Sequence, residues 1–303
     1  MSLPPLARLD EKPDCCAPQP AGLLPKAPLP LGSCDTHVHV FGPASTYRLS
    51  AGRSYTPQLC TLQQYKSVMQ TCGITRAVLV QPSVYGTDNS CLLNALREGG
   101  SAFRGVVVPE AGITDTELDN MHALGVRGIR LNLVNPQVLT IDDAVTLCSR
   151  IAERGWHLQV QLHLTNEADE ARFKALIERV ALRVDLPVVV DHMGRPLSDR
   201  LPTTLLALLK EGRCWVKLSA PYRITAQTQP ATALAYADVL PLAHALVAAN
   251  AGHLLWASDW PHTEQTHSTP SDADLVDLLQ TWVPETATGD RILIDNPARL
   301  YGY

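Results

Sequence analysis

The amino-acid sequence predicts an α/β protein, a (β/α)8 TIM barrel with a single domain. From Ser33 onward, short apolar segments alternate with longer segments of helical period, which indicates repeated strand and helix units around a parallel sheet. Eight such apolar segments can be counted, and some are apolar almost throughout, as strands covered on both faces are. A chain of 303 residues is long enough for one barrel of this kind.

The predicted elements alternate along the whole chain. The eight predicted strands are short apolar runs at residues 34–41, 76–82, 104–109, 127–134, 157–164, 187–193, 214–221 and 254–260. The helices predicted between them are residues 61–71, 89–98, 114–124, 141–154, 167–182, 203–211 and 235–249. Two further helices, 271–281 and 290–301, follow the last strand and could close the ring.

The main alternative fold is an open, doubly wound sheet that binds a nucleotide. None of the predicted strands is followed by GxGxxG or GxxxxGK[ST], the loops that hold phosphates in such sheets, so the barrel is preferred. Residues 1–31 are rich in proline and contain no continuous apolar segment. We therefore expect an irregular N-terminal arm at 1–31, rather than a secretory signal, and the barrel at 32–303.

Composition excludes several classes of function. The net charge of -5 provides no basic surface for nucleic acid, and no apolar run approaches the length of about 20 residues that a membrane span needs. The eight cysteines are scattered and form no CxxC pair. We therefore expect reduced thiols in a cytoplasmic protein, and no zinc site built from thiolates.

Histidines and an aspartate lie where predicted strands end. His37 and His39 in "CDTHVHVFGP" are two residues apart, so on an extended chain their side chains leave from the same face. His192 follows the sixth strand and Asp259 the eighth. Because the carboxyl ends of barrel strands meet at one face, we expect these four side chains to share a pocket. A histidine taken alone is more often structural, and that interpretation is kept for His122, His157, His244, His253 and His267.

Three imidazoles and a carboxylate support two kinds of hydrolysis. They can hold a single divalent metal such as zinc, which leaves a position open for water. Without a metal, the histidines can polarise a carbonyl by hydrogen bonding while Asp259 accepts a proton from water. A barrel that only binds an acidic metabolite is a third interpretation, but such a protein needs no unpaired base beside polarising groups.

Three arginines, Arg130, Arg195 and Arg223, also lie at strand ends. A guanidinium is costly to bury unless an anion meets it, and its planar fork matches a carboxylate. Internal salt bridges, with Asp191 or Asp88 as partners, are the alternative for any one of them. Together the three arginines favour an acidic ligand with more than one carboxylate.

The motifs "DTHVHVFGP", "VQPSVYGTDN", "GVRGIRLN", "VVVDHMGRP", "KLSAPYR", "WASDWPH" and "NPARLYGY" resemble the amidohydrolase superfamily. Within it they are most similar to the 2-pyrone-4,6-dicarboxylate lactonases, over about residues 32–301. The resemblance implies a cytoplasmic hydrolase of aromatic compound catabolism that opens the lactone ring of a dicarboxylic acid. Neither nucleic acid nor a membrane is implied as a partner, and a homo-oligomer is compatible with the family.

The resemblance also implies roles for individual residues. His37, His39 and His192 would polarise the lactone carbonyl without a metal, and Asp259 would act as general base. The substrate would be bound by Arg130, Arg195, Arg223, Tyr55, Ser83, Gln161 and His163. If a metal is present, a single ion such as zinc would be held by His37, His39, His192 and Asp259, with His163 as an additional ligand. The alternative function is then a zinc-dependent hydrolase or decarboxylase acting on another carboxylated substrate.

Two positions depart from the lactonase pattern. Pro136 and Gln161 stand where those enzymes carry an arginine and a tyrosine, so a related lactone acid is an equally acceptable substrate. Lys217 on the seventh strand is expected to be neutralised by a neighbour, and Asp35 to support the histidines from behind.

Overall fold

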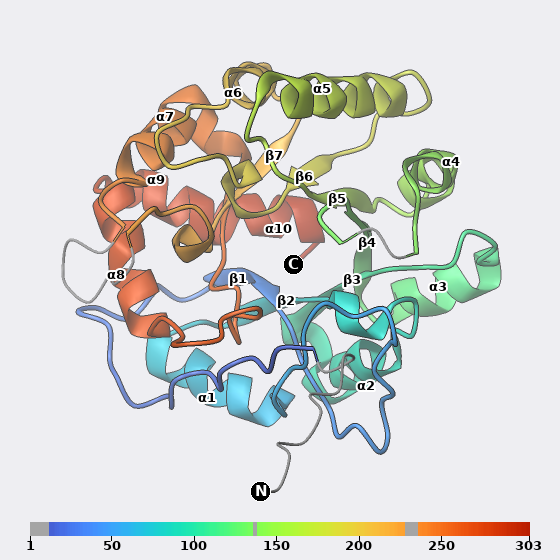
Figure 1. Ribbon diagram of the computed structural model, residues 1–303, viewed down its shortest axis with the longest axis horizontal. Coiled ribbons are helices and arrows are strands. Elements are labelled where there is room, and N and C mark those ends of the chain that lie inside the picture. The colour runs from blue at the N-terminus through green and yellow to red at the C-terminus, as the bar shows by residue number, and fades with distance from the viewer. Residues whose placement is uncertain (1–11, 136–137, 228–235) are drawn as a thin grey trace, which may run out of the picture.

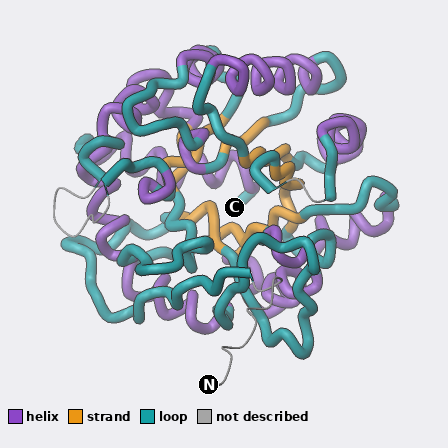
Figure 2. The backbone as a smooth tube through the Cα atoms, in the orientation of Figure 1, coloured by secondary structure: helices purple, strands orange, loops and turns teal. Residues whose placement is uncertain are grey.

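The computed structural model describes residues 12–135, 138–227 and 236–303 (Figure 1). Eight parallel strands pair in the order β1 to β8 and form a nearly closed barrel, which confirms the predicted (β/α)8 fold (Figure 2). The strands are β1 Cys34–Val38, β2 Arg76–Val80, β3 Phe103–Val107, β4 Val126–Asn132, β5 His157–Gln161, β6 Val188–Val190, β7 Trp215–Leu218 and β8 Leu254–Trp256.

Helices surround the strands on the outside of the barrel (Figure 1). They are α1 Leu62–Cys72, α2 Ser90–Gly99, α3 Asp115–Ala123, α4 Ile141–Ala152, α5 Glu167–Ala181, α6 Thr203–Lys210, α7 Leu240–Asn250, α8 Asp272–Trp282, α9 Thr286–Asp290 and α10 Asn296–Tyr301. A π-helical segment, Arg291–Asp295, joins α9 to α10, so the last helical stretch begins earlier than predicted. Helix α7 begins later than predicted, and the predicted start at Ala235 lies outside the described residues.

The predicted strands extend beyond the observed ones at their carboxyl ends. These strands end at Val38, Val190 and Trp256, so His39, His192 and Asp259 lie in the loops that follow β1, β6 and β8. The loops after β1 and β8 are joined to each other. His39 N donates to Trp260 O at 2.8 Å, and Asp259 N donates to His37 O at 3.1 Å. These two bonds close the barrel at its mouth and place Asp259 beside His37.

Side chains alternate between the interior of the barrel and the layer beneath the helices. At the bottom of the barrel, inward-facing apolar residues such as Val78, Val106 and Trp215 pack with Leu300 and Tyr301 of α10. Higher in the barrel the inward positions are polar. Arg130, Gln159, Gln161, Asp191 and Lys217 are all buried there. This polar layer is the floor of the site.

Residues 12–31 contain no helix. The first of them contact loops at the barrel mouth, and the rest run beside α8 and the end of α1, where Lys26 N donates to Asp277 Oδ1 at 2.8 Å and Leu29 N donates to Cys72 O at 2.8 Å. Cys15 N donates to Thr56 O at 2.9 Å, and Cys16 N donates to Gln265 O at 2.7 Å. All eight cysteines are free thiols. Within the part of the chain that the structure describes, no helix combines the length and the apolar character needed to cross a membrane.

Candidate active site

The three histidines and the aspartate predicted from sequence meet in one place. The Nε2 atoms of His37, His39 and His192 lie 3.7, 3.9 and 3.8 Å from Asp259 Oδ1. All four side chains are buried. They come from the ends of β1, β6 and β8, so the sequence correctly placed them at a common face of the barrel.

The backbone that presents these residues is strained. Asp259 has φ of 64°, His192 has φ of 52° and Arg195 has φ of 46°, in the left-handed region that side chains with a Cβ rarely adopt. Such conformations each cost on the order of 1 kcal/mol or more and persist only where surrounding contacts hold them. At the strand ends, these backbone conformations direct the side chains into the barrel mouth.

The two carboxylate oxygens of Asp259 have different surroundings. Oδ2 accepts hydrogen bonds from Tyr222 OH at 2.7 Å and from Arg223 Nε at 2.9 Å. Oδ1 faces the imidazoles and has no hydrogen-bond donor among the described residues. Burial raises the pKa of Asp259. The opposing effect of Arg223 and the three histidines is larger, and it holds this pKa well below its usual value. The carboxylate is therefore ionised, and Oδ1 is free to accept a proton.

The orientation of His39 fixes which of its nitrogens carries the proton. Its Nδ1 lies 2.7 Å from Val80 O, and a carbonyl oxygen can only accept, so Nδ1 is the donor. Burial lowers the pKa of His39 to about 4, so the ring is neutral and Nε2 presents a lone pair to the pocket. The neutral His39 ring therefore presents an acceptor at Nε2, which lies 3.2 Å from His37 Nε2.

His37 and His192 have partners that allow a donor at Nε2. His192 Nδ1 lies 2.9 Å from Ser219 Oγ, which can donate to it. His37 Nδ1 lies 3.2 Å from Asp191 Oδ1 and 3.3 Å from Lys217 Nζ. If Lys217 donates to Nδ1, the proton of the neutral His37 ring is on Nε2 and is directed to His39 Nε2, 3.2 Å away. If Nδ1 instead donates to Asp191, Nε2 carries a lone pair.

Burial keeps these two rings neutral as well. It is the largest influence on both, and it lowers the pKa of His192 to about 3 and the pKa of His37 to well below its usual value. Asp259 and Asp191 act in the opposite direction but do not overcome the loss of solvent. Both imidazoles therefore enter a reaction at neutral pH without a charge.

Two of the three predicted arginines are engaged in ion pairs within the protein. Arg130 Nη2 lies 3.3 Å from Asp191 Oδ2 and donates to Gln161 Oε1 at 2.6 Å. Arg223 contacts both Asp259 and Glu264, at 2.9 and 2.7 Å. Arg195 differs from both, because its Nε and Nη1 are buried and have no hydrogen-bond partner among the described residues. For Arg130, an internal ion pair with Asp191 was the alternative to binding an acidic ligand, and the structure contains this ion pair.

A cavity of about 270 Å³ lies over three of the four central residues, His39, His192 and Asp259, with His37 buried beneath it. It is lined by His39, Tyr55, Ser83, Arg130, Asn132, Asn135, Gln161, His192, Arg223, Asp259, Thr263 and Glu264. The predicted substrate-binding residues Tyr55, Ser83 and Gln161 are therefore at the site. His163 is exposed and lines a different cavity with Asp169 and Phe173. Pro136 lies outside the described residues.

Some residues around the site were given only a structural role from sequence, or none. Lys217 is fully buried and is neutralised by a neighbour, as expected, since its Nζ lies 3.4 Å from Asp191 Oδ1; it also donates to Thr36 O at 2.9 Å and Gln159 Oε1 at 2.8 Å. Tyr222 donates a hydrogen bond to Asp259, and Glu264 forms an ion pair with Arg223. Lys217 inside an apolar strand and Asp191 directly before His192 could have been recognised in the sequence as unusual buried charges. Their partners could not, because these lie on strands that are distant in the sequence. Asp35 supports the site from behind, as expected, by accepting from His37 N at 3.1 Å and Tyr65 OH at 2.9 Å.

The central residues also fit a single divalent metal. His37, His39 and Asp259 offer ligand atoms within 4.8 Å of one another, as do His37, Asp191 and His192. Imidazole nitrogens with a carboxylate oxygen are a donor set that zinc accepts. The unpartnered Oδ1 of Asp259 agrees with this use. In this case His37 would donate from Nδ1 to Asp191, the orientation usual for a metal-bound histidine.

Comparison with known proteins identifies the family. The amidohydrolase family model matches residues 34–303. The 4-sulfomuconolactone hydrolase of Rhizobium radiobacter is 33% identical over 299 residues, 96% of this chain and 96% of that protein. The 2-pyrone-4,6-dicarboxylate hydrolase of Comamonas testosteroni is 32% identical over 288 residues, 91% of this chain and 92% of that protein.

A crystal structure shares the same architecture. The probable 2-pyrone-4,6-dicarboxylic acid hydrolase of Acinetobacter baumannii, with citric acid bound, is 26% identical and matches with a TM-score of 0.77. The match covers 90% of this chain and 100% of the Acinetobacter chain. The family resemblance predicted from the sequence is confirmed, and the chain belongs to the amidohydrolase family of hydrolases.

Proposed function

We propose that this enzyme hydrolyses the ester bond of a lactone that carries a carboxylate. The observation that carries the proposal is the convergence of an ionised, unpartnered carboxylate oxygen with three neutral imidazoles in one cavity. Two relatives that align with nearly the whole chain are named as hydrolases of lactones, a sulfomuconolactone and a pyrone dicarboxylate. The same reaction class suits the residues present here.

In the proposed reaction, a water molecule is held by two acceptors. One hydrogen is directed to Asp259 Oδ1 and the other to His39 Nε2, both of which present lone pairs. As the water oxygen attacks the carbonyl carbon, its proton passes to Asp259. Proton transfer to a positioned base typically contributes about 100-fold or more to the rate.

The carbonyl oxygen gains negative charge as the new bond forms. His192 would donate from Nε2 to this oxygen in the tautomer that Ser219 favours. His37 would donate to the same oxygen once its Nε2 proton turns away from His39 Nε2, which then accepts from the water. The tetrahedral intermediate then collapses, the bond from the carbonyl carbon to the ring oxygen breaks, and the proton on Asp259 passes to that oxygen. The product is an open chain with a hydroxyl or enol group and a new carboxylic acid, which releases the second proton of the water to solvent and becomes a carboxylate.

A bound divalent metal would be held by His37, His39, His192 and Asp259 and would supply Lewis-acid activation of water or of the carbonyl. The substrate-binding residues would be the same in either case. Arg195 has donors without a protein partner that could meet a carboxylate, although it is not among the residues that line the cavity. Arg130, Arg223, Tyr55, Ser83 and Gln161 line it.

Asp259→Asn tests the proposal. The purified enzyme is assayed with a panel of carboxylated lactones, and metal content is measured on the same preparation. We expect ring opening by the unaltered enzyme, and a kcat at least about 100-fold lower in Asp259→Asn with the fold retained. Asp185→Asn, at an exposed position far from the site, serves as the control. Turnover by Asp259→Asn close to normal, or an unaltered enzyme that opens none of the lactones, would refute the proposal.

A further inference from the structure

We propose that His262, oriented by Asp272, is a positioning residue for the general base: its Nδ1 accepts the hydroxyl hydrogen of Tyr222 while Asp259 holds the proton taken from water. The inference rests on the proposed lactone hydrolysis and deepens it, because the base that is assisted is the one assigned there. Neither His262 nor Asp272 lines the catalytic cavity, so both act through Tyr222 rather than on the substrate.

The rotation of the Asp259 carboxylate decides which of its oxygens faces the imidazoles. Such a torsion is broad and nearly two-fold, so contacts with other groups must fix it. Oδ1 has no hydrogen-bond donor among the described residues, and the carboxylate is therefore held through Oδ2. Tyr222 OH donates to Oδ2 at 2.7 Å and Arg223 Nε donates to it at 2.9 Å. Tyr222 thus helps to keep Oδ1 directed at the catalytic cavity.

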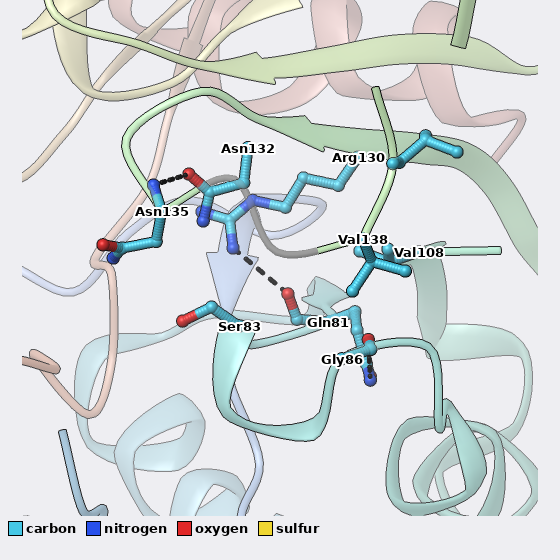
Figure 3. A pocket seen from close by; sticks show the side chains of 9 residues that line it. Gln81, Ser83, Gly86, Val108, Arg130, Asn132, Asn135 and Val138 are labelled. Atoms are coloured by element: carbon cyan, nitrogen blue, oxygen red, sulfur yellow. Dashed lines mark hydrogen bonds between the residues drawn. The ribbon is translucent and has the colours of Figure 1, made fainter. Parts of the chain in front are cut away.

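The Tyr222 hydroxyl differs from the better-fixed polar groups on the other side of the cavity. There, Arg130 donates to the carbonyl of Gln81 at 3.1 Å (Figure 3). Asn132 Oδ1 accepts from the backbone N of Asn135 at 2.9 Å. Backbone partners have fixed directions, whereas the hydrogen of a hydroxyl turns about its C–O bond towards the stronger acceptor. A second acceptor beside Tyr222 therefore affects how Tyr222 serves Asp259.

The second acceptor is His262, which is fully buried. Its Nδ1 lies 3.3 Å from Tyr222 OH, and the two rings meet edge to face, with centroids 5.7 Å apart and planes at 85°. His262 N also donates to Asp259 O at 2.7 Å, and both of these residues have φ of 64°. The two ends of one tight turn therefore direct their side chains to the same hydroxyl.

Asp272 orients the ring of His262 from the other side. His262 Nε2 lies 3.2 Å from Asp272 Oδ1, and neither atom is hydrogen-bonded to another group in the described chain. A carboxylate oxygen accepts, so the proton of a neutral ring belongs on Nε2, and Nδ1 keeps its lone pair for Tyr222. Asp272 is buried at the start of α8, so this contact is shielded from water.

This arrangement assists the proton transfer in the proposed reaction. Before the attack, the Tyr222 hydrogen is directed to Asp259 Oδ2, which is the closer acceptor and carries charge. When Oδ1 takes the water proton, the carboxylate loses its charge, and a hydrogen bond to a neutral acceptor is weaker. The hydrogen then turns to His262 Nδ1. Tyr222 retains its own proton throughout, and Asp259 keeps the proton from water until the ring oxygen takes it.

Two substitutions separate the nitrogens of His262. His262→Asn keeps an acceptor near the position of Nδ1, whereas His262→Gln keeps a polar group near Nε2 and leaves Tyr222 without its second acceptor. On a carboxylated lactone, we expect kcat and kcat/KM to fall together by about tenfold in His262→Gln, as for the loss of one hydrogen bond made in the transition state. The decrease in His262→Asn should be less than about threefold. His253→Gln, directly before β8 at the opposite end of the barrel, is the control and should retain full activity.

The same substitution in a Tyr222→Phe background shows whether His262 acts through the hydroxyl. With no hydroxyl present, His262→Gln should lower kcat by less than about twofold further, because the contact that it removes is already absent. Losses that multiply would mean that His262 acts by another route, and they would overturn the inference. A kcat of His262→Gln equal to that of the unaltered enzyme, or equal losses in His262→Gln and His262→Asn, would overturn it as well.

Variants of Asp272 test the orientation of the ring, and they decide the matter if a His262 variant does not fold. Asp272→Asn retains an oxygen that accepts from Nε2 and should keep kcat within about threefold, whereas Asp272→Ala should lower it by about tenfold at unchanged KM. Asp274→Ala removes an exposed acid from the same helical turn and is the matched control. Equal kcat in Asp272→Ala and Asp274→Ala would overturn the inference. An unaltered enzyme that opens no lactone would instead refute the proposed function.

Discussion

Lys217 illustrates how a single residue organises the interior of the barrel. Its ammonium group contacts Thr36 O and His37 Nδ1 of β1, Gln159 Oε1 of β5 and Asp191 Oδ1 after β6. Burial lowers the pKa of Lys217 to about 8, while Asp191 opposes this shift. Lys217 is therefore charged at neutral pH, and it compensates Asp191 and orients His37 at the same time.

Replacing Lys217 with methionine should be strongly destabilising. The substitution leaves Asp191 with Arg130 as its remaining cationic neighbour at the floor and removes a donor from two further acceptors. Breaking a buried ion pair typically costs about 3 to 5 kcal/mol. We expect the free energy of unfolding in urea to fall by that order in Lys217→Met. Lys210→Met on the exposed end of α6 should change it by less than about 0.5 kcal/mol. Equal stability of the two variants would contradict the assigned pairing.

At the residue scale, the sequence predicted the central set of His37, His39, His192 and Asp259 because strand ends of a barrel share one face. It could not predict which nitrogen of His39 carries the proton, since that depends on Val80 O, which is 41 residues away. The pairing of Arg223 with Glu264 was equally hidden. The residue types at the site are visible in the sequence, whereas their hydrogen-bond partners require the fold.

At the scale of elements, α1 links a helix start to the site. Thr61 forms a capping box with Gln64. Thr61 Oγ1 accepts from Gln64 N at 3.3 Å, and Gln64 Oε1 accepts from Thr61 N at 2.7 Å. The helix carries Tyr65, whose OH donates to Asp35 at 2.9 Å, and Asp35 accepts from the backbone of Ser258 at 3.0 Å. The start of α1 is therefore coupled to the ends of β1 and β8.

Removal of this cap should be measurable. Thr61→Ala leaves the first backbone donors of α1 without their partner, which typically costs about 1 kcal/mol. We expect this decrease in the free energy of unfolding, measured by urea denaturation. Ser67→Ala, on the exposed middle of the same helix, should be neutral or slightly stabilising because alanine favours helix. A cap variant as stable as the Ser67 variant would show that the capping box contributes little.

Element types and their order were predictable because hydrophobic periodicity is a local property. Every predicted strand and helix has a counterpart in the structure, with boundaries shifted by a few residues. The shifts at the ends of β1, β6 and β8 have one cause. Apolar residues continue past the last hydrogen-bonded pair into turns such as His192–Gly194, where Met193 is fully buried but not in a strand.

On the scale of the whole molecule, the barrel is closed by contacts that join its first and last segments. β1 and β8 meet through the bonds between the His37 to His39 segment and the Asp259 to Trp260 segment, and α10 covers the bottom. The interior between these ends contains polar and titratable groups rather than an apolar core. The stability of the molecule should therefore depend on pH through groups far from the surface.

His157 allows this dependence to be measured without disturbing the catalytic residues. It lies at the start of β5, is 1% exposed and packs edge-on against Tyr301 at a ring distance of 5.2 Å. Burial, followed by the charge of Lys217, lowers the pKa of His157 to about 3. The folded protein therefore keeps this ring neutral where the unfolded chain, with a pKa near 6.5, takes up a proton.

Because only the unfolded chain protonates His157 readily, acid favours the unfolded state. Below about pH 6.5 the unfolded state binds one proton more than the folded state at this position, so the free energy of unfolding decreases as the pH falls. Between pH 7 and 5.5 this histidine alone should account for about 1 kcal/mol of the decrease. His157→Phe keeps a ring against Tyr301 but cannot bind a proton, so its stability should fall by about 1 kcal/mol less than that of the unaltered protein over this interval.

Urea denaturation at the two pH values measures this difference. His244→Gln, at an exposed position on α7, should show the same pH dependence as the unaltered protein. If His157→Phe also follows the unaltered protein, the ring of His157 takes up its proton in the folded state as readily as in the unfolded chain. Burial would then not keep this ring neutral, and the pH dependence of stability would have to come from other groups.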